Sequence, residues 1–201
     1  MKQSVEDYKR THSLLLNAAE TLFAENGFSQ TTVEEITGQV SCSKGSLYTY
    51  FPSKTAILLA IIDEKLASYL EGIRFISETE SSLEDMLGRL FEYHITLLQE
   101  NASFFKLISA ERYRLGTKIS AELRTRILTA NQECQSLVQG MLDHYRESLR
   151  DDVSTGDLSI VLRGVISSFL TECVVSELHH GIKEKAPELV SIYLNGVKKR
   201  Q

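Results

Sequence analysis

Hydrophobic residues recur three and four positions apart along most of the chain, which is the spacing of one face of an α-helix. Alternation of the β type is scarce, and the sequence has only two prolines, Pro52 and Pro187. The 201 residues are also enough to bury a substantial core. The pattern therefore predicts an all-α protein.

Residues 31–54 predict two short helices joined by a tight turn. Thr32 and Glu35 have the spacing of a capping box, which starts the first helix. Ser43 can cap the second helix. Pro52 ends it, because proline disfavours a helical conformation in the residue before it. This order of helix, turn and helix is that of a helix-turn-helix.

The second of these helices, residues 44–50, is poor in apolar side chains. Leu47 is its one plainly apolar residue, and Phe51 follows four positions later. A helix with so few anchors is poorly suited to a core, but its small polar surface suits a polar partner. In a helix-turn-helix, the second helix lies in the major groove of DNA.

Two lysines stand in the first turns of predicted helices. Lys44 opens the polar helix and Lys54 opens the next one. The helix macrodipole favours negative charge at a helix N-terminus, so a DNA phosphate would suit both positions. The alternative is that both are solvated surface lysines. The polar helix between them favours DNA.

This stretch resembles the DNA-binding domain of the tetracycline-repressor (TetR) family of bacterial transcription regulators. The resemblance covers the first quarter of the chain. It rests on residues 23–28, on Thr31, Thr32, Val33 and Ile36, and on the ungapped run Ser-Lys-Gly-Ser-Leu-Tyr-Thr-Tyr-Phe-Pro-Ser-Lys at residues 43–54. It implies an N-terminal three-helix helix-turn-helix DNA-binding domain and a C-terminal helical-bundle regulatory and dimerisation domain.

The chain departs from the family at the turn between the two short helices. The family usually has Ala-Gly-Val there, where this chain has Val40-Ser41-Cys42. Glycine suits a left-handed turn residue and serine does not. We therefore expect either a mild strain of about 1 kcal/mol or a slightly different turn.

The resemblance also implies a set of DNA contacts in and around the polar helix. The candidates are Lys44, Tyr48 and Lys54 for phosphates, Ser46 and Thr49 for base edges, and Gly45 for close backbone approach, with Thr32, Ser43 and Tyr50 completing the set. One of the two tyrosines is expected to pack beneath the helix instead. Thus the candidates include at least one side chain that serves the fold.

The domains expected are a helix-turn-helix DNA-binding domain at residues 1–53, a connecting helix at 54–76, and a ligand-binding and dimerisation domain at 77–201. The connecting helix has apolar positions on more than one face. We therefore expect it to contact two bodies and to carry movement from one to the other.

Residues 158–179 predict a helix that is apolar nearly all round and must therefore be buried on both sides. With the last helix it would form a two-fold, four-helix interface with a second subunit. The alternative is an ordinary central core helix. The family resemblance agrees with dimerisation through the C-terminal helices. The candidate interface residues are Val161, Val165, Leu170, Val174, Leu189, Ile192, Tyr193 and Gly196.

By resemblance, an effector site is expected in the C-terminal domain. His94 is the most suggestive residue, because it is a polar group within an apolar stripe. The abundance of aliphatic and aromatic residues favours an apolar or amphipathic ligand. The candidates are Tyr93, His94, Phe104, Phe105, Ile108, Tyr113, Ile127, Ile166, Phe169 and Cys173, each of which has ordinary core packing as its alternative.

Charge and composition narrow the range of functions. The formal net charge of −5 excludes a generic polyanion binder, so DNA binding must rest on a local patch. Cys42, Cys134 and Cys173 are odd in number and widely spaced, which favours neither a disulfide framework nor a zinc site and fits a reducing compartment. We expect a cytoplasmic protein without membrane, metal or cofactor.

No nucleophilic or acid–base constellation stands out, so an enzyme is not expected. The hypothesis is a homodimeric repressor that leaves double-stranded operator DNA when a small apolar or amphipathic effector binds. An effector that promotes DNA binding is the open alternative. The rival hypothesis keeps DNA binding but has the C-terminal domain bind a partner protein instead of a small ligand.

Overall fold

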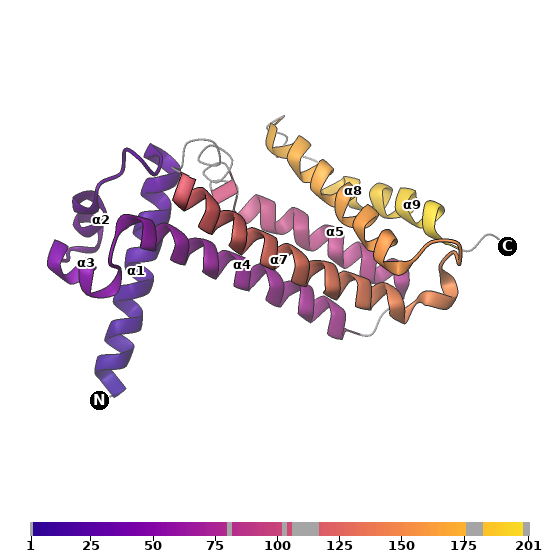
Figure 1. Cartoon of the computed structure of the whole chain (residues 1–201), viewed down its shortest axis with the longest axis horizontal. Helices are drawn as coiled ribbons and strands as arrows, with labels where there is room; N and C mark the ends of the chain where they lie inside the picture. Colours follow the sequence, from indigo (N-terminus) through magenta and orange to yellow (C-terminus); the bar gives the residue numbers. More distant parts are fainter. Residues whose placement is uncertain (1, 80–81, 102–103, 106–116, 176–182, 199–201) are drawn as a thin grey trace. The chain divides into compact units, whose positions relative to one another are not determined.

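The computed structural model describes residues 2–79, 82–101, 104–105, 117–175 and 183–198. Apart from an isolated bridge between Leu149 and Lys198, these residues are helices and their connections, which confirms the all-α prediction (Figure 1). The helices are α1 Lys2–Asn26, α2 Val33–Val40, α3 Lys44–Tyr50, α4 Lys54–Glu78, α5 Leu83–Glu100, α7 Thr117–His144, α8 Thr155–Val175 and α9 Ala186–Val197. Short 3₁₀ turns follow α7 at Arg146–Ser148 and precede α9 at Lys183–Lys185.

The chain forms two compact units. Unit 1 comprises Met1–Leu66 and Ser103–Arg126, and unit 2 comprises Ala67–Ala102 and Ile127–Gln201. The predicted connecting helix is α4, whose first half belongs to unit 1 and whose second half belongs to unit 2. The division at residues 53 and 76 remains a prediction.

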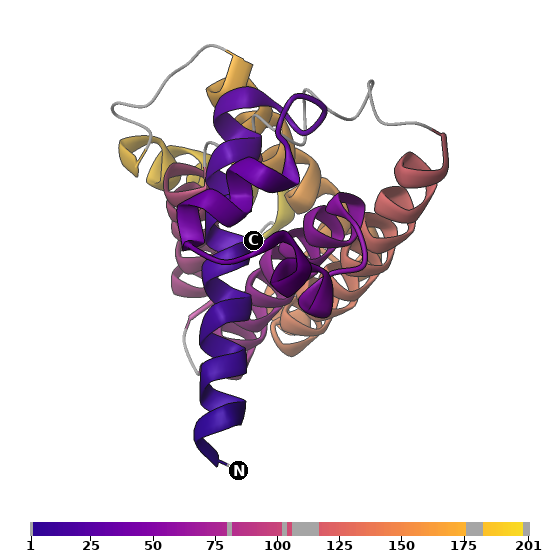
Figure 2. The ribbon, with the colours of Figure 1, turned by 90° about the vertical axis from the view of Figure 1, so that its left-hand side faces the viewer.

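In unit 1, α1 is the long indigo helix of Figure 2, and the two short helices pack in order, α2 on α1 and α3 on α2. Leu15, Ala19 and Phe23 supply a fully buried stripe of α1. Gly27 ends this helix with a φ of 83°, a conformation that glycine adopts without steric cost. Phe28 then folds back, and its ring meets that of Phe23 edge-on at 5.2 Å.

The turn between α2 and α3 has the left-handed geometry for which serine is less suited than glycine. Ser41 has φ 54° and ψ 40°, and it is the one non-glycine residue with positive φ in the described part of the chain. The amides of Ser41 and Cys42 donate to the carbonyls of Gly38 and Thr37, at 3.3 and 3.1 Å. Of the two expectations for this turn, the strained one is the one observed.

In unit 2, α5 packs against α8 and α9. The α4–α5 contact is close at Gly72, where a Cβ would lie 2.2 Å from Cζ of Tyr93. The hydroxyl of Tyr93 lies 3.2 and 3.1 Å from the carbonyls of Ser68 and Tyr69, to which it donates. Glycine at position 72 therefore makes room for a ring that joins two helices of the unit.

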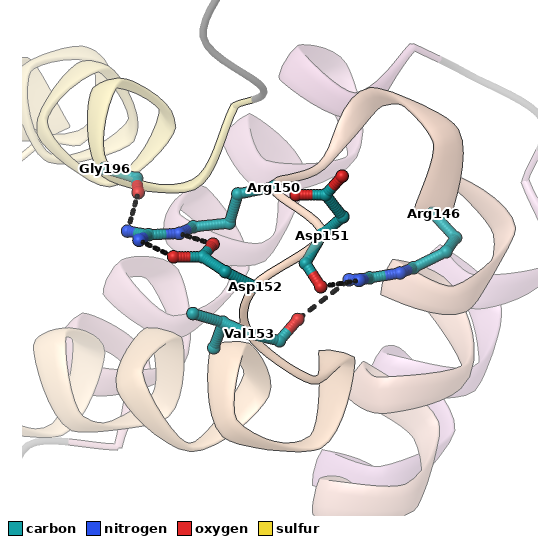
Figure 3. Close-up of polar contacts among 6 residues, drawn as sticks. All are labelled: Arg146, Arg150, Asp151, Asp152, Val153 and Gly196. Carbon is teal, nitrogen blue, oxygen red and sulfur yellow. Dashed lines mark hydrogen bonds and ion pairs between the residues drawn. The ribbon is translucent and has the colours of Figure 1, made fainter.

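Two arginines fix the loop between α7 and α8 (Figure 3). The guanidinium of Arg146 donates to the backbone carbonyls of Asp151 and Val153, at 3.2 and 2.9 Å. Arg150 forms a two-pronged ion pair with Asp152, with both N–O distances at 2.6 Å. Bidentate pairing of this kind fixes orientation as well as distance.

The same loop also holds the end of α9. The guanidinium of Arg150 donates to the carbonyl of Gly196 at 3.2 Å (Figure 3). The backbone amide of Arg150 donates to the carbonyl of Val197 at 2.8 Å. Leu149 and Lys198 form the isolated bridge beside these contacts. The start of α8 and the end of α9 are thus tied to one loop.

Candidate nucleic-acid interface and regulatory surfaces

The polar helix predicted at residues 44–50 is α3, and two apolar residues anchor it. Leu47 is fully buried, and Phe51 is buried immediately after the helix. Ser43 caps the helix, because its hydroxyl accepts from the amide of Ser46 at 3.0 Å. The remaining side chains of α3 are exposed or half-buried. The helix therefore presents a polar face outward, as the sequence pattern indicates.

Gly45 has no packing role within the described chain. A Cβ at this position would meet only the hydroxyl oxygen of Ser43, at 3.8 Å, which is an ordinary contact. Glycine costs about 1 kcal/mol relative to alanine inside a helix. The fold itself has no steric need for glycine at this position. Close approach of an external backbone would explain why glycine is used in spite of this cost.

The two tyrosines of α3 have different surroundings. Tyr48 is 45% exposed. The ring of Tyr50 lies against Tyr8 of α1, with centroids 4.6 Å apart, and the ring of His12 lies 4.7 Å from that of Phe51. One tyrosine therefore packs within the protein, as predicted, although against the side of α1. Tyr8 was not among the predicted site residues, and no spacing in the sequence links it to Tyr50.

Lys44 has a carboxylate partner at the surface. Its ammonium lies 2.5 Å from Oε1 of Glu34 in α2, and both side chains are more than half exposed. The hydrogen bond from Lys44 holds the pKa of Glu34 below its usual value, and Glu34 raises the pKa of Lys44. Exposed ion pairs of this kind contribute little to stability. Lys44 can therefore exchange this carboxylate for another anion.

Lys54 is predicted to contact phosphate, whereas the structure directs its ammonium into unit 1. The Nζ atom lies 2.6 Å from the carbonyl oxygens of Phe28 and Thr31 and 3.3 Å from that of Ser29. It also lies 4.6 Å from the centre of the Phe28 ring. These carbonyls belong to the α1–α2 turn, more than twenty residues earlier, so helix-end electrostatics could not reveal them.

The hydroxyls of Thr32 and Thr49, two other candidate contacts, are also engaged within the chain. Thr32 forms the predicted capping box, with its hydroxyl accepting from the amide of Glu35 at 3.2 Å and its own amide donating to Oε2 of Glu35 at 2.7 Å. The hydroxyl of Thr49 donates to the carbonyl of Ser46 at 2.6 Å. Both threonines are exposed, so their hydroxyl oxygens remain at the surface.

Comparison with known proteins agrees with this geometry. Residues 15–61 match the model of the family described as bacterial regulatory proteins, tetR family. This N-terminal segment belongs to the TetR family of DNA-binding domains. The match confirms the predicted class of function, a DNA-binding transcriptional regulator.

Three similar proteins align with the chain over almost its whole length. The fatty acid metabolism regulator protein of Bacillus subtilis is 21% identical over 206 residues, covering 98% of each chain. The structure of the fatty acid degradation regulator FadR from Bacillus halodurans has a TM-score of 0.77 at 19% identity, covering 94% of this chain and 97% of that one. FadR from Bacillus subtilis, in complex with stearoyl-CoA, has a TM-score of 0.75 at 19% identity, covering 92% and 98%. At these identities the solved structures establish the shared fold.

The predicted effector residues are divided between the two units. Phe104 and Phe105 belong to unit 1, where their rings lie 6.0 Å apart. Ile108 and Tyr113 lie outside the described residues. The unit 2 candidates are the half-buried Tyr93, Ile127 and Phe169 and the buried His94, Ile166 and Cys173.

His94 is held in a hydrogen-bonded chain that joins three helices. Its Nδ1 lies 2.7 Å from the carbonyl of Leu90, so that nitrogen must carry the proton. Its Nε2, 3.2 Å from the hydroxyl of Tyr69, then accepts from that phenol. Sγ of Cys134 lies 3.0 Å from the same hydroxyl oxygen and can donate to it. Burial lowers the pKa of His94 and raises that of Tyr69.

His94 therefore fits the core alternative, since both of its ring nitrogens are satisfied within unit 2. Tyr69 and Cys134 were missed as its partners. In the sequence they occupy ordinary apolar positions of two helices, and only the packing of α4, α5 and α7 brings them together.

Two surface hollows are formed by described residues of unit 2, and neither is lined by the predicted effector residues. One, of about 370 Å³, lies between α5 and α9 and is bordered by Gly88, Pro187, Val190 and Leu194 among others. The other, of about 400 Å³, lies at the end of α4 beside α7 and includes Met86, Leu137, Met141 and Tyr145. The predicted effector residues remain candidates that the described chain does not assemble into either hollow.

The last two helices leave apolar side chains exposed. Val161 and Ile192, predicted at a subunit interface, expose 53% and 59% of their surfaces, and the neighbouring Ile160 exposes 60%. Among the other candidates, Val165, Leu170 and Leu189 are half-buried and Gly196 is exposed, while the side chain of Val174 lies outside the described residues.

Tyr193 does not share this exposed face. It is buried within unit 2, and its hydroxyl donates to the carbonyl of Leu158 at 2.8 Å. Burial also raises its pKa. Tyr193 therefore joins α9 to α8 within one chain, and its place at a subunit interface stays a prediction. Its position follows the same periodicity as the core, which the sequence could not separate from an interface.

Other kinds of site find little support in the described ranges. No group of three or more His, Cys, Asp or Glu side chains there is arranged to hold a metal ion. Likewise, no helix in the described ranges combines the length and the apolar character needed to cross a membrane.

Proposed function

We propose that the protein is a homodimeric repressor that inserts α3 of each subunit into operator DNA and is released by an apolar or amphipathic effector. The observation that carries the proposal is the construction of α3. Two buried apolar residues anchor it in unit 1, and its hydroxyl-rich remainder is exposed or half-buried, with Tyr50 packed against Tyr8. Such a helix serves as the recognition element of a helix-turn-helix.

Phosphate contacts would come first from Lys44 and Tyr48. Both are exposed, and within the described chain Lys44 is held by its surface pair with Glu34. On binding, a phosphate would replace that carboxylate and meet the free amides at the start of α3. Ser46 and Thr49 would face base edges, and Gly45 would let the backbones approach closely. Because phosphate contacts release counterions, affinity should fall steeply with salt.

The second subunit would cover the apolar face of α8 and α9. Ile160, Val161 and Ile192 are largely exposed in the single chain. Gly164 and Gly196 have nothing within 4 Å of a Cβ position, so a partner helix could come close there. A two-fold pair would present two copies of α3, which must be spaced by about one DNA turn, roughly 34–36 Å.

The effector class is proposed from relatives together with composition. The relative from Bacillus subtilis is named a fatty acid metabolism regulator, and the solved FadR of that organism holds stearoyl-CoA. Long-chain acyl thioesters are amphipathic, which fits the ligand class expected from the apolar C-terminal sequence. They are accordingly the first effectors to test, with free fatty acids as the second class.

The test begins with selection of bound fragments from random double-stranded DNA, followed by fluorescence anisotropy with the selected operator. We expect tight, salt-sensitive binding by the dimer and release by micromolar long-chain acyl-CoA, with short-chain acyl-CoA as the matched control. Absence of any selected sequence would refute the operator proposal. Operator binding that no acyl compound alters, but that a co-purifying protein does, would favour the partner-protein alternative.

A further inference from the structure

Lys54 is the first residue of α4, yet its side chain lies against the α1–α2 turn. Its ammonium is within hydrogen-bond distance of three backbone carbonyls, those of Phe28, Ser29 and Thr31. The ring of Phe28 lies on the same ammonium, 4.6 Å from its centroid. These four groups converge on one charged atom from a turn that is distant in sequence.

The number of these carbonyls matches the donor capacity of the side chain. A lysine ammonium has three N–H donors and accepts no hydrogen bond. Three carbonyl oxygens supply three acceptors, two of them at the short distance of 2.6 Å. They also supply the negative partial charge that offsets a cation placed at a helix N-terminus. A phosphate at Lys54 would have to displace at least one of them.

The turn that Lys54 holds determines where α2 begins. The carbonyl of Thr31 accepts from Lys54, and the next residue, Thr32, caps α2. Thr31 is buried, and its hydroxyl lies 3.1 and 2.9 Å from the carbonyls of Leu22 and Gly27. Because α3 packs on α2, a shift of this turn would shift α3 as well.

We propose that Lys54 is a positioning residue for DNA binding, which acts by fastening the α1–α2 turn to the first turn of α4 and makes no contact with phosphate. This inference rests on the proposed function, in that α3 is taken as the DNA-reading helix. It also links the first turn of α4 directly to the helix-turn-helix. A displacement of the first turn of α4 would pull the turn before α2 with it.

Charge-removing and charge-keeping variants separate this role from a phosphate contact. Lys54→Met removes the ammonium, and Lys54→Arg keeps the positive charge but replaces a compact tetrahedral donor with a planar one. Lys44→Met and Lys44→Arg are the matched controls at the other lysine. For each variant, operator affinity is measured by anisotropy from 50 to 300 mM salt, with hydrogen exchange of the amides at residues 28–35 in the absence of DNA.

We expect both Lys54 variants to bind the operator about tenfold more weakly, as for loss of a charged hydrogen bond. The dependence of affinity on salt should keep its slope. Hydrogen exchange of the amides at residues 28–35 should be faster than in the wild type. Lys44→Met should instead flatten the slope by about 1.8, for two contacts per dimer at about 0.9 each, and Lys44→Arg should keep it.

The proposal is overturned if Lys54→Arg binds like the wild type, if Lys54→Met flattens the slope, or if neither variant changes affinity. Loss of the unit 1 fold in both variants, seen by circular dichroism without DNA, supports it, because a phosphate contact has no effect in the free protein. If the wild type itself binds no operator, the proposed function fails, while faster exchange at residues 28–35 would still test the fastening.

Discussion

A helix face is exposed near each end of the chain, and the two faces differ in chemistry. The exposed side of α3 is polar, and Leu47 and Phe51 are its buried anchors, with the ring of Tyr50 against Tyr8. The exposed side of α8 and α9 carries the large apolar side chains of Ile160, Val161 and Ile192. A polar face suits a charged duplex, and an apolar face suits a second copy of itself. The contrast supports the proposal that one end reads DNA and the other assembles the dimer.

The largest effect should come from placing charge on the apolar face. Val161→Asp would put an ionised group into the proposed interface without disturbing the interior of the subunit, because Val161 is mostly exposed in the single chain. We expect a monomer by sedimentation velocity and operator binding weaker by at least a hundredfold, since both half-sites must be held together.

Phe75→Asp provides the matched control for this change. Phe75 is also an exposed apolar residue of unit 2, at 72% of its surface, but it lies on α4. This variant should remain dimeric and bind DNA as the wild type does. A dimeric Val161→Asp protein would remove the basis for assigning assembly to α8 and α9.

The second prediction concerns the buried hydrogen bonds among Tyr69, His94 and Cys134 in unit 2. They belong to the interior and to neither exposed face. Tyr69→Phe would leave Nε2 of His94 and Sγ of Cys134 without their shared hydroxyl partner. Leaving buried polar groups unpaired costs about 1–3 kcal/mol, so we expect the free energy of unfolding in urea to fall by about 2 kcal/mol. Tyr93→Phe, whose hydroxyl is nearer solvent, should cost less. Equal losses for the two variants would contradict the special role of Tyr69.

The third prediction follows from the lowered pKa of His94. Burial is the cause of the shift, and it disfavours the protonated imidazole in the folded state. Below a pH of about 6.5 the unfolded chain therefore binds a proton that the folded chain does not. Stability should be level above that pH and fall as pH drops below it, by up to about 1.4 kcal/mol per pH unit.

The measurement is urea unfolding at pH 7.5, 6.5 and 5.5 for the wild type and for His94→Gln. The variant should be less stable at every pH, yet its loss between pH 6.5 and 5.5 should be smaller than that of the wild type. Parallel pH curves for the two proteins would mean that another group titrates on unfolding.

The two regions also differ in how well the sequence predicts them. Local chemistry determines most of unit 1: the Thr32–Glu35 capping box starts α2 at Val33, Ser43 caps α3, and Gly27 ends α1. Each of these features needs only residues within one helical turn. The position of Lys54 could not be predicted in this way, because its partners lie 23 to 26 residues away.

In unit 2 the same reasoning predicts the helices but not which of their faces are buried and which are exposed. Helical periodicity places Tyr193 and Ile192 side by side as apolar residues, although one is buried and the other is exposed. Likewise His94 stands out by its polarity, but its partner Tyr69 does not. Distinguishing interface from core, or pocket from packing, requires knowing which helices meet, and periodicity carries no such information.

The smallest effect should come from the turn that distinguishes this chain from its family. Ser41 adopts φ 54°, and a left-handed conformation costs an ordinary residue about 1–2 kcal/mol. Ser41→Gly relieves that strain but makes the unfolded chain more flexible. We therefore expect a net gain of less than about 1 kcal/mol in the free energy of unfolding, with operator affinity within about twofold of the wild type. The opposite change, Gly27→Ser, places serine at φ 83° and should destabilise unit 1. If Ser41→Gly lowers stability, the hydroxyl of Ser41 contributes more than its backbone costs, and the turn is adapted to serine instead of strained by it.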